Sequence, residues 1–321
     1  MESNSNAVVT HYNSIKEVGL SVRNESKVLF LRNFNNWIKS VLINNIINKV
    51  TQYFGEISVL DLGSGKGGDQ LKWAKHKVSH ITFLDIADES INQSKERFRR
   101  NQFRYSADFF VSDFTKDLLN DQLSRCYNII SCQFAFHYSF ESLEQAKLTF
   151  KNISDKLSKN GYFIGTTVSG FELIKRLQTS KNNSFGNDFY KVAFSPEITI
   201  DNIPLFGTKY NFFLDGSVDC PEFVVYPPLM DHLALENNLK LITRCSFPEF
   251  YETNIDNNRD LIMKIKALRQ IYVDQLKSIS TDEFHIEKQF RDSSKYWKLL
   301  TISQAEWEII QLYDVFVYQK F

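Results

Sequence analysis

The fold of this chain is decided by the stretch Ile57-Ser-Val-Leu-Asp-Leu-Gly-Ser-Gly-Lys-Gly-Gly68. Its first half is a short, mostly apolar run, which is typical of a buried strand. Its second half is rich in glycine, which lets the backbone turn sharply and approach a ligand without an intervening Cβ. The stretch therefore predicts a strand that ends in a ligand-binding turn, with a helix beginning near Asp69.

Strand and helix patterns alternate on both sides of this turn. Before it, apolar residues recur at steps of three to four from residue 25 to residue 46, which predicts an amphipathic helix. After it, strands are expected at 81–85, 109–111, 127–131 and 161–167, and helices at 69–75, 89–100 and 141–157. Asp88 is expected to cap the helix that begins at Glu89. This alternation predicts an α/β fold, in which helices cover both faces of a doubly wound, mostly parallel sheet.

The alternation breaks after residue 180. A loop at 182–187 and short strands at 190–194, 209–214 and 223–226 predict a β-rich insertion at about 180–226. Helix and strand patterns return at 229–242 and at 307–321. We therefore expect a flexible segment at 1–24 and a single domain at 25–321, with a mobile loop at 278–294.

Composition excludes several classes of protein. The 38 basic and 38 acidic residues cancel, which argues against a protein that coats DNA through long-range attraction. No apolar stretch is long enough to span a membrane, and the N-terminus lacks the pattern of a signal peptide. The four cysteines include no C-x-x-C pair, so neither a zinc site nor a disulfide framework is indicated.

The glycine turn alone leaves two cofactors open. Gly63, Gly65 and Gly68 satisfy the G-x-G-x-x-G pattern of dinucleotide-binding proteins, and Asp85 would bind a ribose diol of either cofactor. Asp61 favours S-adenosylmethionine, because a carboxylate there would attract an ammonium group and repel a pyrophosphate. Asp113 follows the third strand, where it would accept a hydrogen bond from an adenine amino group. Both acids are also compatible with plain turn or capping roles.

Other segments are more specific. One such stretch follows the fourth strand: Ser131-Cys-Gln-Phe-Ala-Phe-His-Tyr-Ser-Phe-Glu-Ser142. Eight further blocks accompany it: His11–Asn13, Leu31–Ser40, Asp61–Asp69, Asp85–Ala87, Gly165–Thr167, Ser184–Asn187, Pro204–Gly207 and Asp219–Phe223. In this order the blocks resemble the eukaryotic mRNA cap guanine-N7 methyltransferases. Two positions depart from that family. Ser64 stands in place of a cysteine, and Val168 in place of a proline that walls the base pocket.

The resemblance implies a Rossmann-like class I methyltransferase with a seven-stranded sheet, a β-rich insertion that builds the cap pocket and an N-terminal helical extension. For S-adenosylmethionine it implies Lys39, Gly63, Asp85, Asp113, Gln133 and Tyr138. For the cap it implies Asn35, Asn36, Lys66, Lys72, Arg97, Phe134, His137, Glu222 and Tyr313. Taken singly, the aromatic residues also fit core packing, and Lys39, Lys72 and Arg97 also fit solvated helix faces.

The chemistry of these residues agrees with the resemblance. A buried Glu222 would accept hydrogen bonds from guanine N1–H and the 2-amino group, between aromatic faces. Guanine N7 carries a lone pair and no proton, so we expect positioning alone, with neither a catalytic base or nucleophile nor a metal. The substrate would be the GpppN end of 5′-capped RNA, made by a separate guanylyltransferase in the nucleus. Association with that enzyme or with an activating subunit stays open.

Three rival functions also stay open. A methyltransferase acting on a small metabolite or on another RNA position would share the glycine turn and Asp85, but it would not require Glu222. A non-enzymatic module that binds capped RNA or a protein would not need the intact turn. A dehydrogenase would use the same turn for a dinucleotide.

Overall fold

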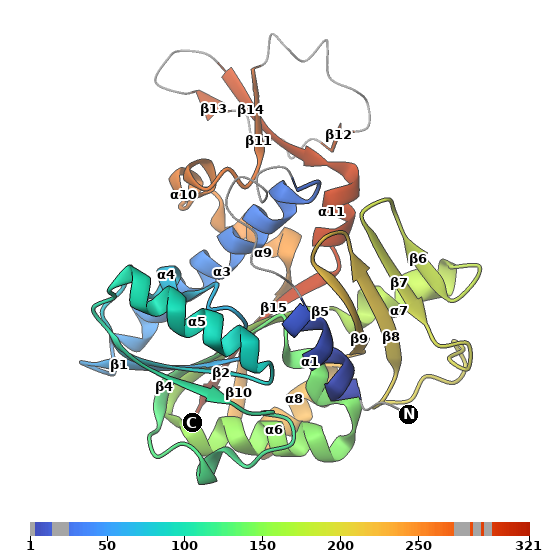
Figure 1. Ribbon diagram of the computed structural model, residues 1–321. Helices are drawn as coiled ribbons and strands as arrows, with labels where there is room; N and C mark the ends of the chain where they lie inside the picture. The colour runs from blue at the N-terminus through green and yellow to red at the C-terminus, as the bar shows by residue number, and fades with distance from the viewer. Residues whose placement is uncertain (1–3, 15–25, 273–282, 285–289, 292–296) are drawn as a thin grey trace.

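The computed structural model describes residues 4–14, 26–272, 283–284, 290–291 and 297–321. Its centre is a seven-stranded sheet in the order β10-β15-β5-β4-β1-β2-β3 (Figure 1). The strands are β1 Ile57–Leu62, β2 Val78–Asp85, β3 Ser106–Val111, β4 Tyr127–Gln133, β5 Leu157–Val168, β10 Leu239–Ser246 and β15 Tyr313–Lys320. β15 runs antiparallel to both of its neighbours, while β1 to β5 pair in parallel. The predicted doubly wound, mostly parallel sheet is confirmed.

Helices cover both faces of this sheet because alternate residues of its strands point to opposite sides. Val59 and Ile129 face a core that includes α3, whereas Leu60 and Ile130 face a second core under α6 and α8. The α-helices of the domain are α3 Leu29–Val50, α4 Gln70–Trp73, α5 Asp88–Asn101, α6 Leu143–Lys156, α7 Gly170–Thr179, α8 Pro227–Glu236, α9 Phe247–Asn254, α10 Arg259–Lys264 and α11 Gln304–Ile310. A 3-10 helix, η2 Phe136–Glu141, follows β4, and another, η1 Leu119–Asp121, follows β3.

The insertion forms a second, antiparallel sheet in the order β6-β7-β8-β9. Its strands are β6 Ser184–Gly186, β7 Tyr190–Phe194, β8 Lys209–Leu214 and β9 Val218–Phe223. Two details of the prediction were wrong. The expected loop at 182–187 contains β6, and the last strand ends at Phe223 instead of beginning there, because Val218 to Phe223 pair with β8.

A third sheet joins β11 Arg269–Tyr272 and β14 Trp297–Ser303, with the short strands β12 Glu283–Phe284 and β13 Phe290–Arg291 also paired to β14. Most of the loop expected at 278–294 lies outside the described residues. In the part of the chain that the structure describes, no helix combines the length and apolar character needed to cross a membrane.

The N-terminal segment differs from the sequence-based expectation. Residues 1–24 were expected to be flexible, but Asn4–Ser14 form a helix, α1, that packs against β9 and α5. Asp88 also takes another role than predicted. Ala87 occupies the N-cap position of α5, and the Asp88 carboxylate accepts a hydrogen bond of 2.8 Å from the Asn13 side chain. Asp88 thus binds the end of α1 instead of capping its own helix.

Candidate active site

The glycine turn after β1 brings three strands of the sheet together. Gly63 has φ +63°, and a Cβ at this position would lie 2.5 Å from the Cβ of Ala135, just after β4. The next glycine, Gly65, donates its backbone N–H to the Asp85 carboxylate at the end of β2 (2.7 Å). Only glycine permits both the backbone conformation and the close approach at position 63.

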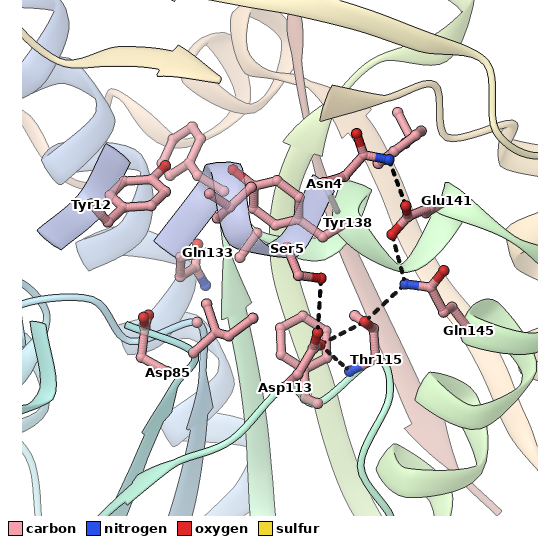
Figure 2. A pocket seen from close by; sticks show the side chains of 17 residues that line it. Asn4, Ser5, Tyr12, Asp85, Asp113, Thr115, Gln133, Tyr138, Glu141 and Gln145 are labelled. Carbon is pink, nitrogen blue, oxygen red and sulfur yellow. Dashed lines mark hydrogen bonds between the residues drawn. The ribbon is translucent and has the colours of Figure 1, made fainter. Parts of the chain in front are cut away.

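A cavity of about 220 Å³ opens at this turn (Figure 2). Its walls come from the turn, the ends of β2, β3 and β4, the start of η2 and one side of α1. The predicted residues that line it are Gly63, Asp85, Asp113, Gln133, Phe134 and Tyr138. Most of the exposed wall is apolar, with a few carboxyl and amide groups, which is the usual character of a cofactor site.

The two predicted carboxylates in this cavity are held by different partners. Asp85 also accepts a hydrogen bond from the backbone N–H of Ala87 (2.9 Å). Burial raises the pKa of Asp85, and the two backbone hydrogen bonds oppose that rise. Asp113 accepts hydrogen bonds from the hydroxyl of Thr115 at 2.6 Å and from the hydroxyl of Ser5 at 3.3 Å. Ser5 belongs to α1, so the N-terminal helix reaches into the site.

Helix α1 forms one wall of the cavity, and the sequence analysis missed it. Val8 is buried, and Tyr12 lines the cavity beside Asp85 and Gln133 (Figure 2). At its first turn the Asn4 amide donates to Glu141 at 2.6 Å and accepts from Lys209 at 2.8 Å. The only signal of this helix in the sequence was the His11–Asn13 block, and Asn13 of that block binds Asp88.

Beside the cavity, buried polar and aromatic side chains form a cluster around Glu222, which adjoins the cavity through His137 and Tyr138. This carboxyl group is 4% exposed, and it accepts a hydrogen bond from the hydroxyl of Tyr210 at 2.8 Å. Burial raises the pKa of Glu222 to about 8. The Nε2 atom of His137 lies 3.5 Å from Glu222 Oε1, and burial lowers the pKa of His137 to about 3.

Three buried polar atoms beside Glu222 and the cavity have no hydrogen-bond partner among the described residues. They are both ring nitrogens of His137 and the hydroxyl of Tyr138. Because buried polar atoms in native proteins are nearly always paired, such a cluster indicates a site built to receive a polar ligand. Asn35 Oδ1 on α3 is also buried and also has no hydrogen-bond partner among the described residues.

The aromatic residues predicted for the base converge on the same place. Phe134 has φ +59°, a conformation unfavourable for a bulky side chain, and its N–H is fixed by the carbonyl oxygen (3.0 Å) and hydroxyl (3.1 Å) of Thr166. Its ring meets that of Tyr313 edge-on, with centroids 5.1 Å apart, and Tyr313 stacks on Phe247. Burial, reinforced by the charge of Glu222, raises the pKa of Tyr313. Phe134 thus lines the cavity and also contacts Tyr313.

Two of the predicted cations share one acid that was not among the predicted site residues. Asp69 Oδ1 lies 2.7 Å from the ammonium of Lys39 and 2.7 Å from that of Lys72. Lys72 also donates to the Asn36 side chain at 2.9 Å, and burial lowers the Lys72 pKa to about 8. Lys39 does not line the cavity, but its ammonium lies 5.9 Å from the centre of the Phe134 ring.

Three more charged residues complete this region. Asp61 is buried, and burial together with the charge of Asp69 raises its pKa well above the usual value. Arg97 donates to the carbonyl of Gly67 at 3.4 Å, which places it beside the glycine turn, and Lys66 is half-buried within the turn itself. Asp69 was visible in the sequence only as the last residue of the glycine block.

The strand order with one antiparallel strand, the glycine turn and the acid at the end of β2 define a class I S-adenosylmethionine-dependent methyltransferase. Residues 1–321 match the family model described as the mRNA (guanine-N(7))-methyltransferase domain. The chain belongs to this family, and it is an enzyme that methylates guanine N7 of the mRNA cap with S-adenosylmethionine.

Individual relatives agree along nearly the whole chain. The mRNA cap guanine-N(7) methyltransferase of Drosophila melanogaster is 37% identical, over 99% of this chain and 78% of its own length. That of Caenorhabditis elegans is 34% identical, over 98% of this chain and 87% of its own length. In Schizosaccharomyces pombe the corresponding protein is 37% identical, over 75% of this chain and 69% of its own length.

Proposed function

We propose that this enzyme holds the cap guanine at the cluster around Glu222 and transfers the methyl group by positioning alone, without a general base or a metal. The observation that carries this proposal is that the same aromatic residues line the cavity and adjoin the buried cluster around Glu222. Phe134 and Tyr138 line the cavity beside Asp85, while Phe134 touches Tyr313, and Tyr138 adjoins His137 and so the cluster around Glu222. A purine and a methyl donor would therefore meet face to face at these residues.

The cavity fits S-adenosylmethionine in its donor set. The absent side chain at Gly63 leaves room for close backbone approach, and the apolar wall suits an adenine ring. Asp85 would accept the ribose hydroxyls and Asp113 the adenine amino group. Gln133, Tyr138 and Lys39 would serve the methionine end, with Asp69 holding Lys39 in place for the carboxylate of the cofactor. When bound, this cofactor supplies a methyl group activated by the positive charge on sulfur.

The cluster around Glu222 fits guanine. The ionised carboxylate would accept hydrogen bonds from N1–H and the 2-amino group, and neutral His137 would bond the base carbonyl or the sugar. The rings of Phe134, Tyr138 and Tyr313 would hold the purine, and they favour the delocalised positive charge of the N7-methylated product. Asn35, Asn36, Lys66, Lys72 and Arg97 would bind the triphosphate of the cap.

The residues of this chain would have little chemistry to perform. Guanine N7 has an in-plane lone pair and no proton to remove, so a general base has no task. Holding the nucleophile and the methyl carbon in line at near-attack distance is worth several kcal/mol of the barrier, on the order of 7 for well-oriented reactants. We place the reaction in the nucleus, because capping accompanies transcription, with a separate guanylyltransferase supplying the GpppN end.

The test compares three acceptors in the same methyl-transfer assay: GpppA-capped RNA, uncapped triphosphate RNA and cap-premethylated RNA. The proposal expects transfer to the first alone, and competition by GpppG but not by unrelated small acceptors. Transfer to premethylated or uncapped RNA at a comparable rate would contradict guanine N7 as the target. A change in rate on adding a chelator or a divalent metal would contradict the metal-free mechanism.

A further inference from the structure

The charges of this neutral chain are unevenly distributed. Between residues 95 and 104 the sequence Lys-Glu-Arg-Phe-Arg-Arg-Asn-Gln-Phe-Arg contains five basic residues and one acid. Two further lysines, Lys75 and Lys77, follow α4. We call the exposed members of this group the basic face: Lys75, Lys77, Arg99, Arg100 and Arg104.

Little in the structure neutralises the basic face. Glu96 pairs with Arg100 at 2.8 Å on the surface of α5, and a pair so exposed contributes little. Within the described residues, the structure gives no acidic partner to Arg99, Arg104, Lys75 or Lys77. Side chains that lie in solvent without partners keep their full charge for an external anion.

The basic face begins where the proposed triphosphate site ends. The side chain of Gln70 in α4 donates to the backbone carbonyl of Ser94 in α5 at 2.9 Å, and Tyr105 donates to the carbonyl of Gln70 at 3.2 Å. These bonds hold the two helices side by side on one surface of the domain (Figure 1). Arg97, beside the glycine turn, lies three positions before Arg100, so these two side chains share one side of α5.

The far end of the face is fixed by the sheet. Lys77 directly precedes β2 and Arg104 lies just before β3, and these strands pair in parallel with His80 opposite Ser106. Adjacent strands lie about 4.8 Å apart, so the two cations stand at the same end of the sheet. The cationic surface therefore runs from the glycine turn along α5 to the opposite end of the sheet.

We propose that the basic face binds the phosphates of the RNA chain that follows the cap. This inference rests on the proposed triphosphate site, because only a triphosphate held by Lys66, Lys72 and Arg97 would deliver the next nucleotides to Arg99. The interaction is electrostatic and independent of sequence. It would raise the affinity for a capped transcript above that for an isolated cap.

The test compares two acceptors, the dinucleotide GpppA and a capped RNA of about 20 nucleotides, whose phosphates can reach the whole face. The double variant Arg99→Gln/Arg104→Gln should raise the KM for the long RNA at least about threefold and leave the KM for GpppA unchanged. The slope of log KM for the long RNA against log salt concentration should also decrease by about 1.4. Each lost contact with a single-strand phosphate lowers that slope by about 0.7.

The matched control is Lys147→Gln/Lys240→Gln, which removes two equally exposed cations from α6 and β10 and should change neither KM. An unchanged KM for the long RNA in the Arg99/Arg104 variant would overturn the proposal. The basic face would then be explained better as a binding surface for an acidic protein. An equal rise for both acceptors would also overturn it. Failure of the unaltered enzyme to methylate GpppA would instead contradict the proposed function, so the two failures are distinguishable.

Discussion

His137 Nε2 lies 3.5 Å from Glu222 Oε1, and both side chains are buried. Burial opposes charge on both groups, which lowers the pKa of the imidazole to about 3 and raises that of the carboxyl group to about 8. Without a ligand the pair is therefore neutral and not a salt bridge. Two N–H donors from guanine would favour the ionised carboxylate, so cap binding near neutral pH would release a proton.

Replacing Glu222 by Gln tests its role as the acceptor for guanine. The amide has the same shape but presents an N–H donor to the base, and it loses two charge-assisted hydrogen bonds. We expect kcat/KM for GpppA-capped RNA to fall about 100-fold or more, since each such bond contributes about 1.5–3 kcal/mol. Steady-state methyl transfer measures this change.

Glu306→Gln is the matched control for that variant. Glu306 is another buried carboxyl group with a pKa raised by burial, but it binds the backbone of Leu31 and the hydroxyl of Ser303, away from the cavity and the cluster around Glu222. Its replacement should lower the melting temperature and leave kcat/KM of the folded enzyme nearly unchanged. If kcat/KM fell equally in both variants, the result would contradict a specific role for Glu222 in binding guanine.

The pH dependence should show two limbs. Glu222 must be ionised to accept both guanine donors, so kcat/KM should rise as the pH increases toward 8. Lys72, whose pKa is lowered to about 8, loses its charge above that pH, so kcat/KM should fall again. In the Glu222→Gln variant, the rise of kcat/KM toward pH 8 should disappear, and the fall of kcat/KM above pH 8 should remain. A profile that is flat between about pH 6 and 8 in the unaltered enzyme contradicts this assignment.

Gly63→Ala should damage the fold of the turn more than Gly65→Ala. Both glycines have positive φ, which costs an alanine about 1 kcal/mol, but only the Cβ at position 63 would meet a neighbour, Ala135, at 2.5 Å. Thermal unfolding with and without S-adenosylhomocysteine separates stability from cofactor binding. Equal melting temperatures for the two variants would show that the contact with Ala135 is easily relieved.

The contacts of α1 should govern cofactor affinity. The double variant Asn4→Ala/Ser5→Ala removes the hydrogen bonds to Glu141 and Asp113, each worth about 1 kcal/mol, and should raise the KM for S-adenosylmethionine up to about thirtyfold. Ser14→Ala serves as control, because that exposed hydroxyl bonds only the carbonyl of His11 within its own helix. If both variants keep the original KM, α1 does not contribute to binding the cofactor.

Asp69→Asn should affect both substrates at once. The Asp69 carboxylate holds Lys39, assigned to the cofactor, and Lys72, assigned to the triphosphate. Without its charge the two ammonium groups lose their shared anchor, and we expect both KM values to rise. The alkaline limb should also move to lower pH, because Asp69 raises the pKa of Lys72. A rise confined to one KM would rule out the shared role.

The mostly parallel sheet with helices on both faces, and the glycine turn after its first strand, could be predicted from sequence, because buried strands and glycine turns are local patterns. Helix α1 could not. Its sequence, Asn-Ser-Asn-Ala-Val-Val-Thr-His-Tyr-Asn-Ser, is made largely of weak helix formers, and only Val8 is fully buried. Contacts with distant residues such as Asp113 and Glu141 hold this helix, and such contacts leave no local pattern.

The role of Asp69 was hidden for a related reason. Lys39 and Lys72 could each be assigned an external anion from their positions in the sequence, but their sharing of one internal carboxylate depends on how α3 packs against α4. The end of β9 was misplaced because the apolar run from Phe223 to Tyr226 looks like a strand, whereas pairing with β8 ends at Phe223.

The position of α1 has a consequence for repeated catalysis. The helix lines one side of the cavity through Ser5, Val8 and Tyr12. Asn4 and Asn13 hold it at opposite ends, on Glu141 and Asp88. Release of either end would uncover that side of the cavity, so the strength of these two contacts would influence how fast a spent donor leaves.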